Sequence, residues 1–147
     1  MKIALVCSHG GHLSEMLLLM EAFEGHEVFF ITYQSPRTIA LKHKKYLLEN
    51  IGTNPLKMLH AFAKILIIFV KERPGLVIST GSEIAIPAFI LAKLLRIRTV
   101  FIESWCRVKT KSGTGKILYH IADLFLVQCP ELARIYGKRA LYRGAVI

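Results

Sequence analysis

The chain begins MKIALVCSHGGHLSEMLLLMEAF (residues 1–23), with a glycine pair between two segments of different periodicity. Met1–Val6 is a short apolar run typical of a buried strand, and Leu13–Phe23 has the apolar spacing of a helix. A strand, a glycine turn and a helix start together form a nest of backbone N–H groups that favours a phosphate or another anion. The turn Gly10–His12 is therefore a candidate ligand site, although many strand-to-helix turns need glycine for steric reasons alone.

The composition of the 147 residues limits the class of protein. The hydrophobic fraction is 53% and the mean hydropathy is +0.44, which are high values for a soluble protein. No stretch reaches the roughly 18 apolar residues that a membrane-spanning helix needs, and the first apolar run is too short for a secretory signal. We expect one domain over residues 1–147, with surplus apolar surface that meets lipid or another protein.

Charge and cysteine content indicate the partner and the compartment. The formal net charge of +10 points to an anionic partner: nucleic acid, an acidic membrane surface or a phosphorylated substrate. Nucleic acid fits poorly, because the chain has no basic motif interleaved with aromatic residues. Cys7, Cys106 and Cys129 are too few and too far apart for a zinc site or a disulfide framework, so we expect a reducing cytosol and no metal.

Strand-like and helix-like segments alternate along the chain. The strand-like runs are Ile3–Val6, Val28–Thr32, Leu76–Ser79, Thr99–Ile102 and Phe125–Val127. The helix-like segments between and after them are Leu13–Phe23, Arg37–Leu48, Leu56–Glu72, Ala85–Leu95 and Gly115–Ala122. This alternation predicts right-handed βαβ units, and hence an α/β fold with a Rossmann-like parallel sheet and helices on both faces. Ligands of such sheets bind at the carboxyl ends of the strands, which here are Cys7–His12, Ser79–Ser82, Glu103–Arg107 and Gln128–Cys129.

The predicted helix Leu56–Glu72 carries a narrow basic stripe on an otherwise apolar sequence. The stripe consists of Lys57, His60, Lys64 and Lys71. It fits an interfacial helix whose lysines meet anionic lipid head groups, or a buried sheet-covering helix with one solvated edge. A second basic cluster, on the predicted helix Arg37–Leu48, is interpreted as a solvated face.

Three side chains near the predicted strand ends are candidates for chemistry. His12 lies at a helix start, where the dipole favours the neutral imidazole that a general base needs. Glu15 follows one turn later and could orient that ring or simply face the positive helix end. Glu103 directly follows a strand and is a second base candidate or a ligand for sugar hydroxyls. Alternatively, it braces its loop through an ion pair with Arg107.

A second turn of glycine and hydroxyl residues supports an anion site. It contains Ser79, Thr80, Gly81 and Ser82, and together with Gly10 and Gly11 it could hold a pyrophosphate. The segment Ser112–Lys116 has part of a Walker-type composition without its spacing, so an ATPase is excluded.

Five motifs in order resemble the Alg14 family, including its bacterial PssD-type relatives, which are similar to the N-terminal half of MurG. The motifs are S-x-G-G-H-x-x-E-M (Ser8–Met16), V-I-S-T-G (Val77–Gly81), E-S-x-C-R-V (Glu103–Val108), T-G-K-x-L-Y (Thr114–Tyr119) and A-D-x-F-x-V-Q (Ala122–Gln128). The resemblance implies the acceptor-binding half of a GT-B glycosyltransferase at the cytoplasmic face of a membrane. It also implies a separate donor-binding subunit, a polyprenyl-pyrophosphate-linked sugar as acceptor, a UDP-sugar of N-acetylglucosamine type as donor, and no cofactor.

Roles carry over from the family by motif. His12 and Glu103 become the catalytic candidates, and the acceptor pyrophosphate is held by Gly10, Gly11, Ser79, Thr80, Gly81, Ser82 and Arg107. Eukaryotic members have an N-terminal transmembrane helix that is not expected here, so peripheral membrane contact falls to Lys57, His60, Lys64 and Lys71. The tail Leu141–Ile147 matches the segment that packs on the donor subunit, or else it forms an edge strand.

Two other functions remain open from the sequence. The chain could be a non-catalytic membrane anchor and activator that recruits a catalytic donor-binding subunit, and near-normal turnover by that subunit alone would favour this. It could also be a free-standing nucleotide-sugar enzyme, which tight UDP binding by the isolated chain would indicate.

Overall fold

A single parallel sheet of seven strands organises the computed structural model, which describes residues 1–146. The strand order is β3-β2-β1-β4-β5-β6-β7, and each neighbouring pair is parallel. The strands are β1 (Lys2–Cys7), β2 (Glu27–Tyr33), β3 (Lys45–Leu48), β4 (Leu76–Gly81), β5 (Arg98–Ile102), β6 (Leu124–Val127) and β7 (Ala140–Tyr142). The predicted Rossmann-like α/β fold is confirmed.

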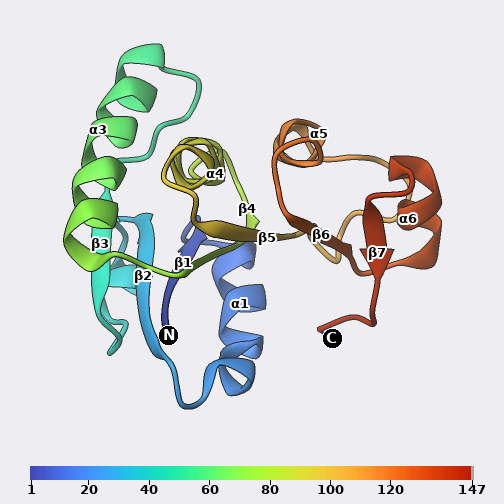
Figure 1. Cartoon of the computed structure of the whole chain (residues 1–147), viewed down its shortest axis with the longest axis horizontal. Helices are drawn as coiled ribbons and strands as arrows, with labels where there is room; N and C mark the ends of the chain where they lie inside the picture. Colours follow the sequence, from blue (N-terminus) through green and yellow to red (C-terminus); the bar gives the residue numbers. More distant parts are fainter. Residues whose placement is uncertain (147) are drawn as a thin grey trace.

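Helices cover both faces of this sheet. They are α1 (Gly11–Leu18), α2 (Pro36–Ile39), α3 (Pro55–Glu72), α4 (Ala85–Leu94), α5 (Gly113–Leu118) and α6 (Pro130–Tyr136), with a 3₁₀ turn, η1, at Met20–Phe23. Figure 1 shows α3, α4 and α5 on one face and α1 on the other. Because side chains alternate along a strand, Phe29 packs in the core cluster under α3 and α4, whereas Phe30 packs in the cluster with Leu13 and Met16 of α1.

The strand order reverses beside β1. Strands β2 and β3 extend from one side of β1, and β4 to β7 extend from the other. The carboxyl ends of β1 and β4 are therefore neighbours, with Val6 opposite Ser79 and Cys7 opposite Gly81. A reversal of this kind opens a crevice beyond the strand ends, and this position is the usual ligand site of open parallel sheets.

The predicted helix Arg37–Leu48 is wrong. Only Pro36–Ile39 is helical, because the Ser35 hydroxyl caps a single turn and the chain then leaves the helix. Lys45–Leu48 forms β3, paired with the end of β2. Of the basic residues that were interpreted as one helix face, Arg37 lies in α2, Lys45 lies in the edge strand, and Lys42, His43 and Lys44 lie in the loop between them.

The carboxyl-terminal part contains helix α6, which the sequence analysis did not predict, and the edge strand β7, which it gave as one alternative for the tail. Helix α6 follows β6 and leads to β7. Leu141 and Tyr142 of the predicted tail lie in this edge strand, and residues 143–146 continue past it. Ile147, the last residue of that tail, lies outside the described residues. Over the described residues, no helix combines the length and apolar character needed to cross a bilayer.

Candidate functional site

A cleft of about 730 Å³ opens at the strand-order reversal. Its walls come from the loops after β1, β4 and β5 and from the start of α5. The lining residues include Gly11, His12, Gly81, Ser82, Ser104, Trp105, Arg107 and Thr114. Three of the four predicted strand-end turns thus meet at one cavity.

His12 is held at the cleft by two hydrogen bonds to Thr80. The imidazole Nδ1 lies 2.8 Å from the Thr80 carbonyl oxygen, and the Thr80 hydroxyl donates to the His12 carbonyl at 2.6 Å. A carbonyl oxygen can only accept, so Nδ1 carries the hydrogen. The lone pair of the neutral ring is consequently on Nε2, the nitrogen that can accept a proton.

Gly81 makes this placement of His12 possible. Its φ is +130°, and a Cβ atom at this position would lie 2.6 Å from Cε1 of the His12 ring. Real side chains do not approach so closely, and a residue with a Cβ also disfavours this backbone conformation. The glycine of the second turn therefore makes room for the histidine of the first.

The second predicted turn divides into a buried half and an exposed half. Ser79 and Thr80 are fully buried; the Ser79 hydroxyl accepts from the Gly81 N–H, and the Thr80 hydroxyl is bound to His12. Gly81 and Ser82 line the cleft. Only Gly81 and Ser82 of this turn are thus accessible from the cleft, whereas Ser79 and Thr80 support it from beneath.

Glu15 ties the cleft loops together. Its buried carboxylate accepts hydrogen bonds from the Ser104 hydroxyl at 2.8 Å and from the Gln128 side-chain amide at 3.0 Å. Burial raises the pKa of this carboxyl group, and the hydrogen bonds oppose the rise. The His12 ring takes its orientation from Thr80, so the hydrogen bonds of Glu15 serve to join α1 to the ends of β5 and β6.

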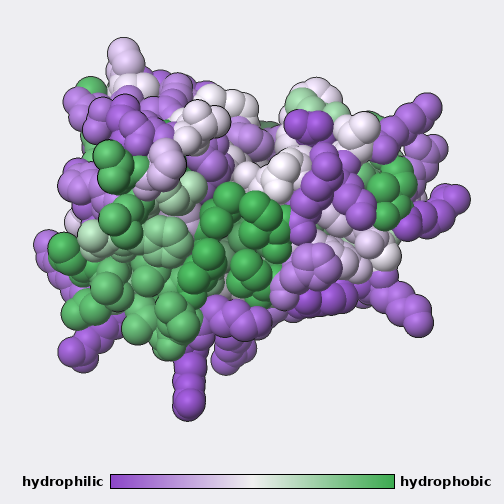
Figure 2. Space-filling model, turned by 90° about the horizontal axis from the view of Figure 1, so that it is seen from above, coloured by the Kyte–Doolittle hydropathy of each residue, from purple (hydrophilic) through white to green (hydrophobic). Residues whose placement is uncertain are grey.

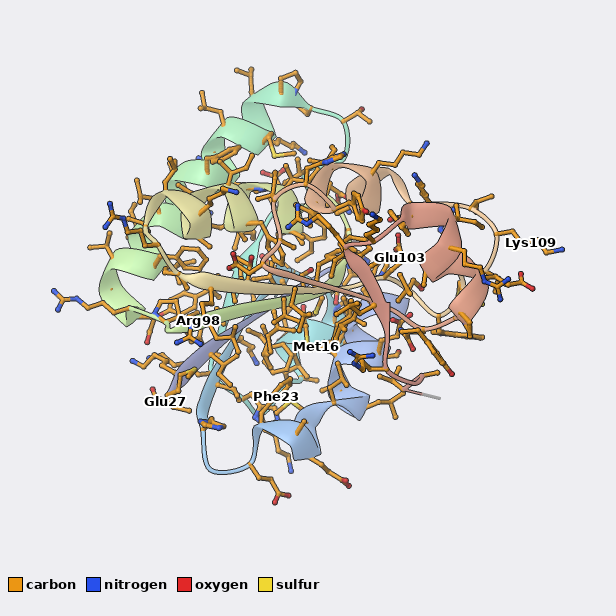
Figure 3. The ribbon with its side chains drawn as sticks, turned by 45° about the vertical axis from the view of Figure 1, so that its right-hand side comes forward. Met16, Phe23, Glu27, Arg98, Glu103 and Lys109 are labelled. Carbon is orange, nitrogen blue, oxygen red and sulfur yellow. The ribbon has the colours of Figure 1, made fainter. Side chains whose placement is uncertain are left out.

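Glu103 is buried behind the cleft wall. Its side chain is 1% exposed and accepts hydrogen bonds from the Ser112 N–H at 3.2 Å, the Ser112 hydroxyl at 2.8 Å and the Tyr136 hydroxyl. Figure 3 shows Glu103 inside the molecule and Lys109 extending from the outer end of the loop. Glu103 does not line the cleft. The ion pair considered between Glu103 and Arg107 is not formed, because the Arg107 guanidinium donates to the Thr110 hydroxyl. This arrangement favours a positioning role over that of a base.

Two residues near the cleft were not identified as site residues from the sequence. Arg37 donates to the Gly10 carbonyl at 3.1 Å and to the Ser14 hydroxyl at 2.9 Å, which brings its positive charge over the start of α1. Trp105 lines the cleft and is 48% exposed. The sequence could have pointed to Trp105 as a cleft residue, because Trp105 is the x of the motif E-S-x-C-R, which directly follows a strand.

A second candidate surface lies on α3, which has three distinct faces. One face is buried against the sheet through Ala61, Ile65, Ile68 and Phe69. A second carries the basic stripe, in which Lys57 pairs with Glu49 at 3.0 Å and Lys71 lies over the Tyr46 ring. The third is apolar yet exposed, and consists of Leu56, Leu59, Leu66, Ile67 and Val70.

This apolar face continues across the neighbouring helix. Leu94 at the end of α4 is 74% exposed, and Leu95 follows it. Figure 2 shows an extended apolar area on this side of the molecule, bordered by hydrophilic residues. We call the exposed apolar residues of α3 together with Leu94 and Leu95 the α3–α4 apolar surface.

Comparisons with known proteins identify relatives by sequence. The family model described as "Oligosaccharide biosynthesis protein Alg14 like" matches residues 36–146. The UDP-N-acetylglucosamine transferase subunit ALG14 of Homo sapiens is 37% identical over 83 residues, covering 52% of this chain and 38% of the human protein. The Saccharomyces cerevisiae subunit of the same name is 26% identical over 183 residues, covering 100% of this chain and 77% of the yeast protein. The matches to the human, rat and mouse subunits span less than half of those proteins.

Solved structures share the fold. Acinetobacter baumannii MurG superposes with a TM-score of 0.81 at 17% identity, covering 99% of this chain and 45% of MurG. UDP-N-acetylglucosamine 2-epimerase from Rickettsia bellii gives a TM-score of 0.78, also at 17% identity, and 45% of that chain is covered. At these identities the similarity concerns the fold alone.

Proposed function

Because the chain belongs to the Alg14-like family of oligosaccharide biosynthesis proteins, we propose that it is the acceptor-binding, membrane-associated subunit of a two-part UDP-N-acetylglucosamine transferase. Its acceptor is a sugar linked through pyrophosphate to a polyprenol, and a separate subunit binds the nucleotide sugar. The naming of the relatives as transferase subunits supports the donor and the need for a partner. The observation that carries the proposal is His12, whose Nδ1 is bound by Thr80 so that Nε2 is the basic nitrogen at the cleft.

The proposed chemistry is a displacement at the anomeric carbon of the donor sugar. The acceptor hydroxyl oxygen forms a bond to this carbon while the bond from the carbon to UDP breaks, and the hydroxyl proton passes to Nε2 of His12. A positioned base of this kind contributes about 10²- to 10⁴-fold to a rate. The Thr80 carbonyl fixes the tautomer and stabilises the imidazolium that forms, which makes Thr80 a positioning residue.

The acceptor pyrophosphate is proposed to lie between the first two strand-end loops. The N–H groups at the start of α1, beginning at Gly11, and the Gly81–Ser82 turn border the cleft from two sides, and Arg107 supplies positive charge from a third. Glu83 also borders the cleft, but its carboxylate is bound by the hydroxyls of Ser82 and Tyr33 at 2.7 and 2.8 Å.

A reconstituted transfer assay tests the proposal. The chain, the candidate donor-binding subunit and their mixture are each given UDP-N-acetylglucosamine and a lipid-pyrophosphate-linked N-acetylglucosamine. We expect transfer in the mixture alone, and at least a hundredfold loss with His12→Ala. His26→Ala, which removes an exposed histidine remote from the cleft, is the matched control. Transfer by the donor subunit alone at the rate of the mixture would instead identify this chain as an anchor.

Membrane association is proposed to use the α3–α4 apolar surface, with the adjoining lysines at anionic head groups. Each basic residue near an anionic bilayer contributes about 1 kcal/mol, so Lys64→Glu with Lys71→Glu removes at least about 2 kcal/mol, roughly thirtyfold in affinity. Co-sedimentation with phosphatidylglycerol vesicles measures this loss. Arg134→Glu with Lys138→Glu, on and just after α6, changes the net charge equally and serves as the control. Equal losses of vesicle binding in both double variants would mean that binding depends only on the net charge of the chain.

A further inference from the structure

Trp105 is a large aromatic side chain of the cleft to which the proposed chemistry gives no role. It is the single tryptophan of the chain, it lines the cleft together with His12, and it is 48% exposed. Leaving half of an indole in water forgoes a large part of its burial energy, so an exposed tryptophan in a concave site is a candidate contact for a ligand. The cleft residues named with it are otherwise small, polar or charged.

Hydrogen bonds fix the loop residues on either side of Trp105, whereas Trp105 itself is half exposed. The Ser104 hydroxyl, directly before Trp105, donates to the buried Glu15 carboxylate at 2.8 Å. The Ser104 oxygen also accepts from the Cys106 N–H at 3.3 Å, and the Ser104 carbonyl accepts from the Arg107 N–H at 3.0 Å. With the loop already ordered, a ligand that covers the indole has to fix only its two side-chain dihedral angles, which is a low entropy cost for so large a contact area.

We propose that the Trp105 indole stacks against the pyranose ring of the acceptor sugar. This inference rests on the proposed function and names the part of the acceptor that Trp105 recognises. A pyranose presents a face of C–H bonds, which packs on the electron-rich face of an aromatic ring, while its hydroxyl groups remain at the ring edge. Trp105 thus contacts the sugar, Arg107 and the Gly81–Ser82 turn contact the pyrophosphate, and His12 contacts the reacting hydroxyl.

The fluorescence of the lone tryptophan tests stacking directly in the full chain. Two soluble short-chain probes are titrated: a prenyl pyrophosphate that carries N-acetylglucosamine, and the same prenyl pyrophosphate without sugar. Binding of each is measured independently by calorimetry. We expect both probes to bind, and only the sugar-bearing probe to shift the Trp105 emission to shorter wavelength. Equal responses to both, or binding of the sugar probe with no response, would overturn the stacking proposal alone. Failure of both probes to bind would overturn the acceptor site itself, and stacking with it.

Kinetics of the complex provide the second measurement. Stacking acts equally on bound substrate and transition state, so Trp105→Ala is expected to raise KM for the lipid-linked acceptor about tenfold, or 1.4 kcal/mol. The kcat of Trp105→Ala should stay within about threefold of the wild-type value, and Trp105→Phe should restore most of the affinity for the acceptor. Ile135→Ala, an exposed apolar residue of α6, is the matched control.

Two other roles for Trp105 predict different results. If it anchors the chain in lipid, vesicles without acceptor shift its emission and Trp105→Ala loses vesicle binding. If it contacts the donor subunit, Trp105→Ala weakens assembly of the complex and raises KM for the UDP-sugar instead. Either result would overturn the proposal.

Discussion

At the residue scale, the site depends on pairs of residues that belong to different loops. His12 and Thr80 are joined by two hydrogen bonds across 68 positions of sequence. Gly81 leaves the space that the histidine ring occupies. Neither relation is visible in either motif alone, because each motif contains only one member of the pair.

Gly81→Ala should displace His12 from its position at the cleft. The new methyl group collides with the imidazole, so we expect turnover of the complex to fall by at least about a hundredfold, as it would if the proposed base were lost. Gly137→Ala is a matched control, because Gly137 also has a positive φ, of +117°, and would place its Cβ 2.8 Å from the Tyr119 hydroxyl, outside the cleft. Both variants should lose stability in thermal unfolding, but only Gly81→Ala should lose turnover. Full turnover by Gly81→Ala would contradict the arrangement described for His12.

Glu103→Ala should act through stability. The substitution leaves the partly buried Ser112 and the buried Tyr136 hydroxyls without their acceptor, at a cost of about 1–3 kcal/mol in the free energy of unfolding measured in urea. Glu103→Gln keeps a side-chain oxygen as acceptor and should lose less. Activity should follow stability in both variants. Loss of turnover in both variants with an unchanged free energy of unfolding would instead show that Glu103 takes part in the chemistry.

The sequence predicted several residues of the cleft, but not which of the predicted side chains are buried behind its wall. Gly11, His12, Gly81, Ser82 and Arg107 line the cleft, as expected for residues that follow parallel strands. The buried positions of Ser79, Thr80 and Glu103 could not be foreseen, because position after a strand does not specify on which side of the cleft wall a side chain lies.

At the scale of elements, prediction succeeded where a segment was long and its periodicity strong. Helix α3 was predicted as Leu56–Glu72 and extends over Pro55–Glu72, because an 18-residue amphipathic pattern has few alternatives. The prediction for Arg37–Leu48 failed because this segment combines a single helical turn with a four-residue edge strand, and so short a strand shows little apolar alternation. The exposed apolar face of α3 lies between its basic stripe and its buried face, a division that the sequence alone did not resolve.

Helix α5 should tolerate alanine at one of its glycines and not at the other. A Cβ atom on Gly115 would meet the Tyr136 hydroxyl at 2.1 Å and the Glu103 carboxylate at 2.3 Å, whereas Gly113 has nothing within 4 Å. Gly115→Ala is therefore expected to lower the free energy of unfolding by about 1–3 kcal/mol, the usual cost of overpacking a core. Gly113→Ala should leave it unchanged or raise it slightly, since alanine favours a helix. Denaturation in urea compares the two, and equal effects would mean that α5 moves freely away from Glu103.

At the scale of the whole molecule, a buried carboxylate joins the beginning of the sheet to α3. Glu72, at the end of α3, accepts from Lys2 of β1 at 3.0 Å, from Lys44 at 2.6 Å and from the Tyr46 hydroxyl of β3. Hydrogen bonds from Lys44 and Tyr46, opposed by burial and aided by Lys2, lower the pKa of Glu72 from 4.5 to about 2. Elements that are distant in sequence thus depend on one ionised group.

Acid should therefore weaken the fold through Glu72. A lowered pKa stabilises the folded state fully above pH 4.5, and this contribution is lost as the pH falls from 4.5 toward 2. Thermal unfolding measured from pH 2 to pH 6 should show a steeper fall for the wild type than for Glu72→Gln, which lacks the titrating group. Parallel curves for the two proteins would show that carboxylates other than Glu72 determine the loss of stability in acid.

The reversal of strand order at β1 also has a consequence for how the chain is made. Strand β1 pairs with β2 on one side, but its other side can pair only with β4, which begins at residue 76. A nascent chain on the ribosome therefore carries an open apolar strand edge until β4 has been synthesised, and pairing between distant segments is slow. The cleft can form only after that pairing is complete, so chaperone demand during translation should be greatest before β4 emerges.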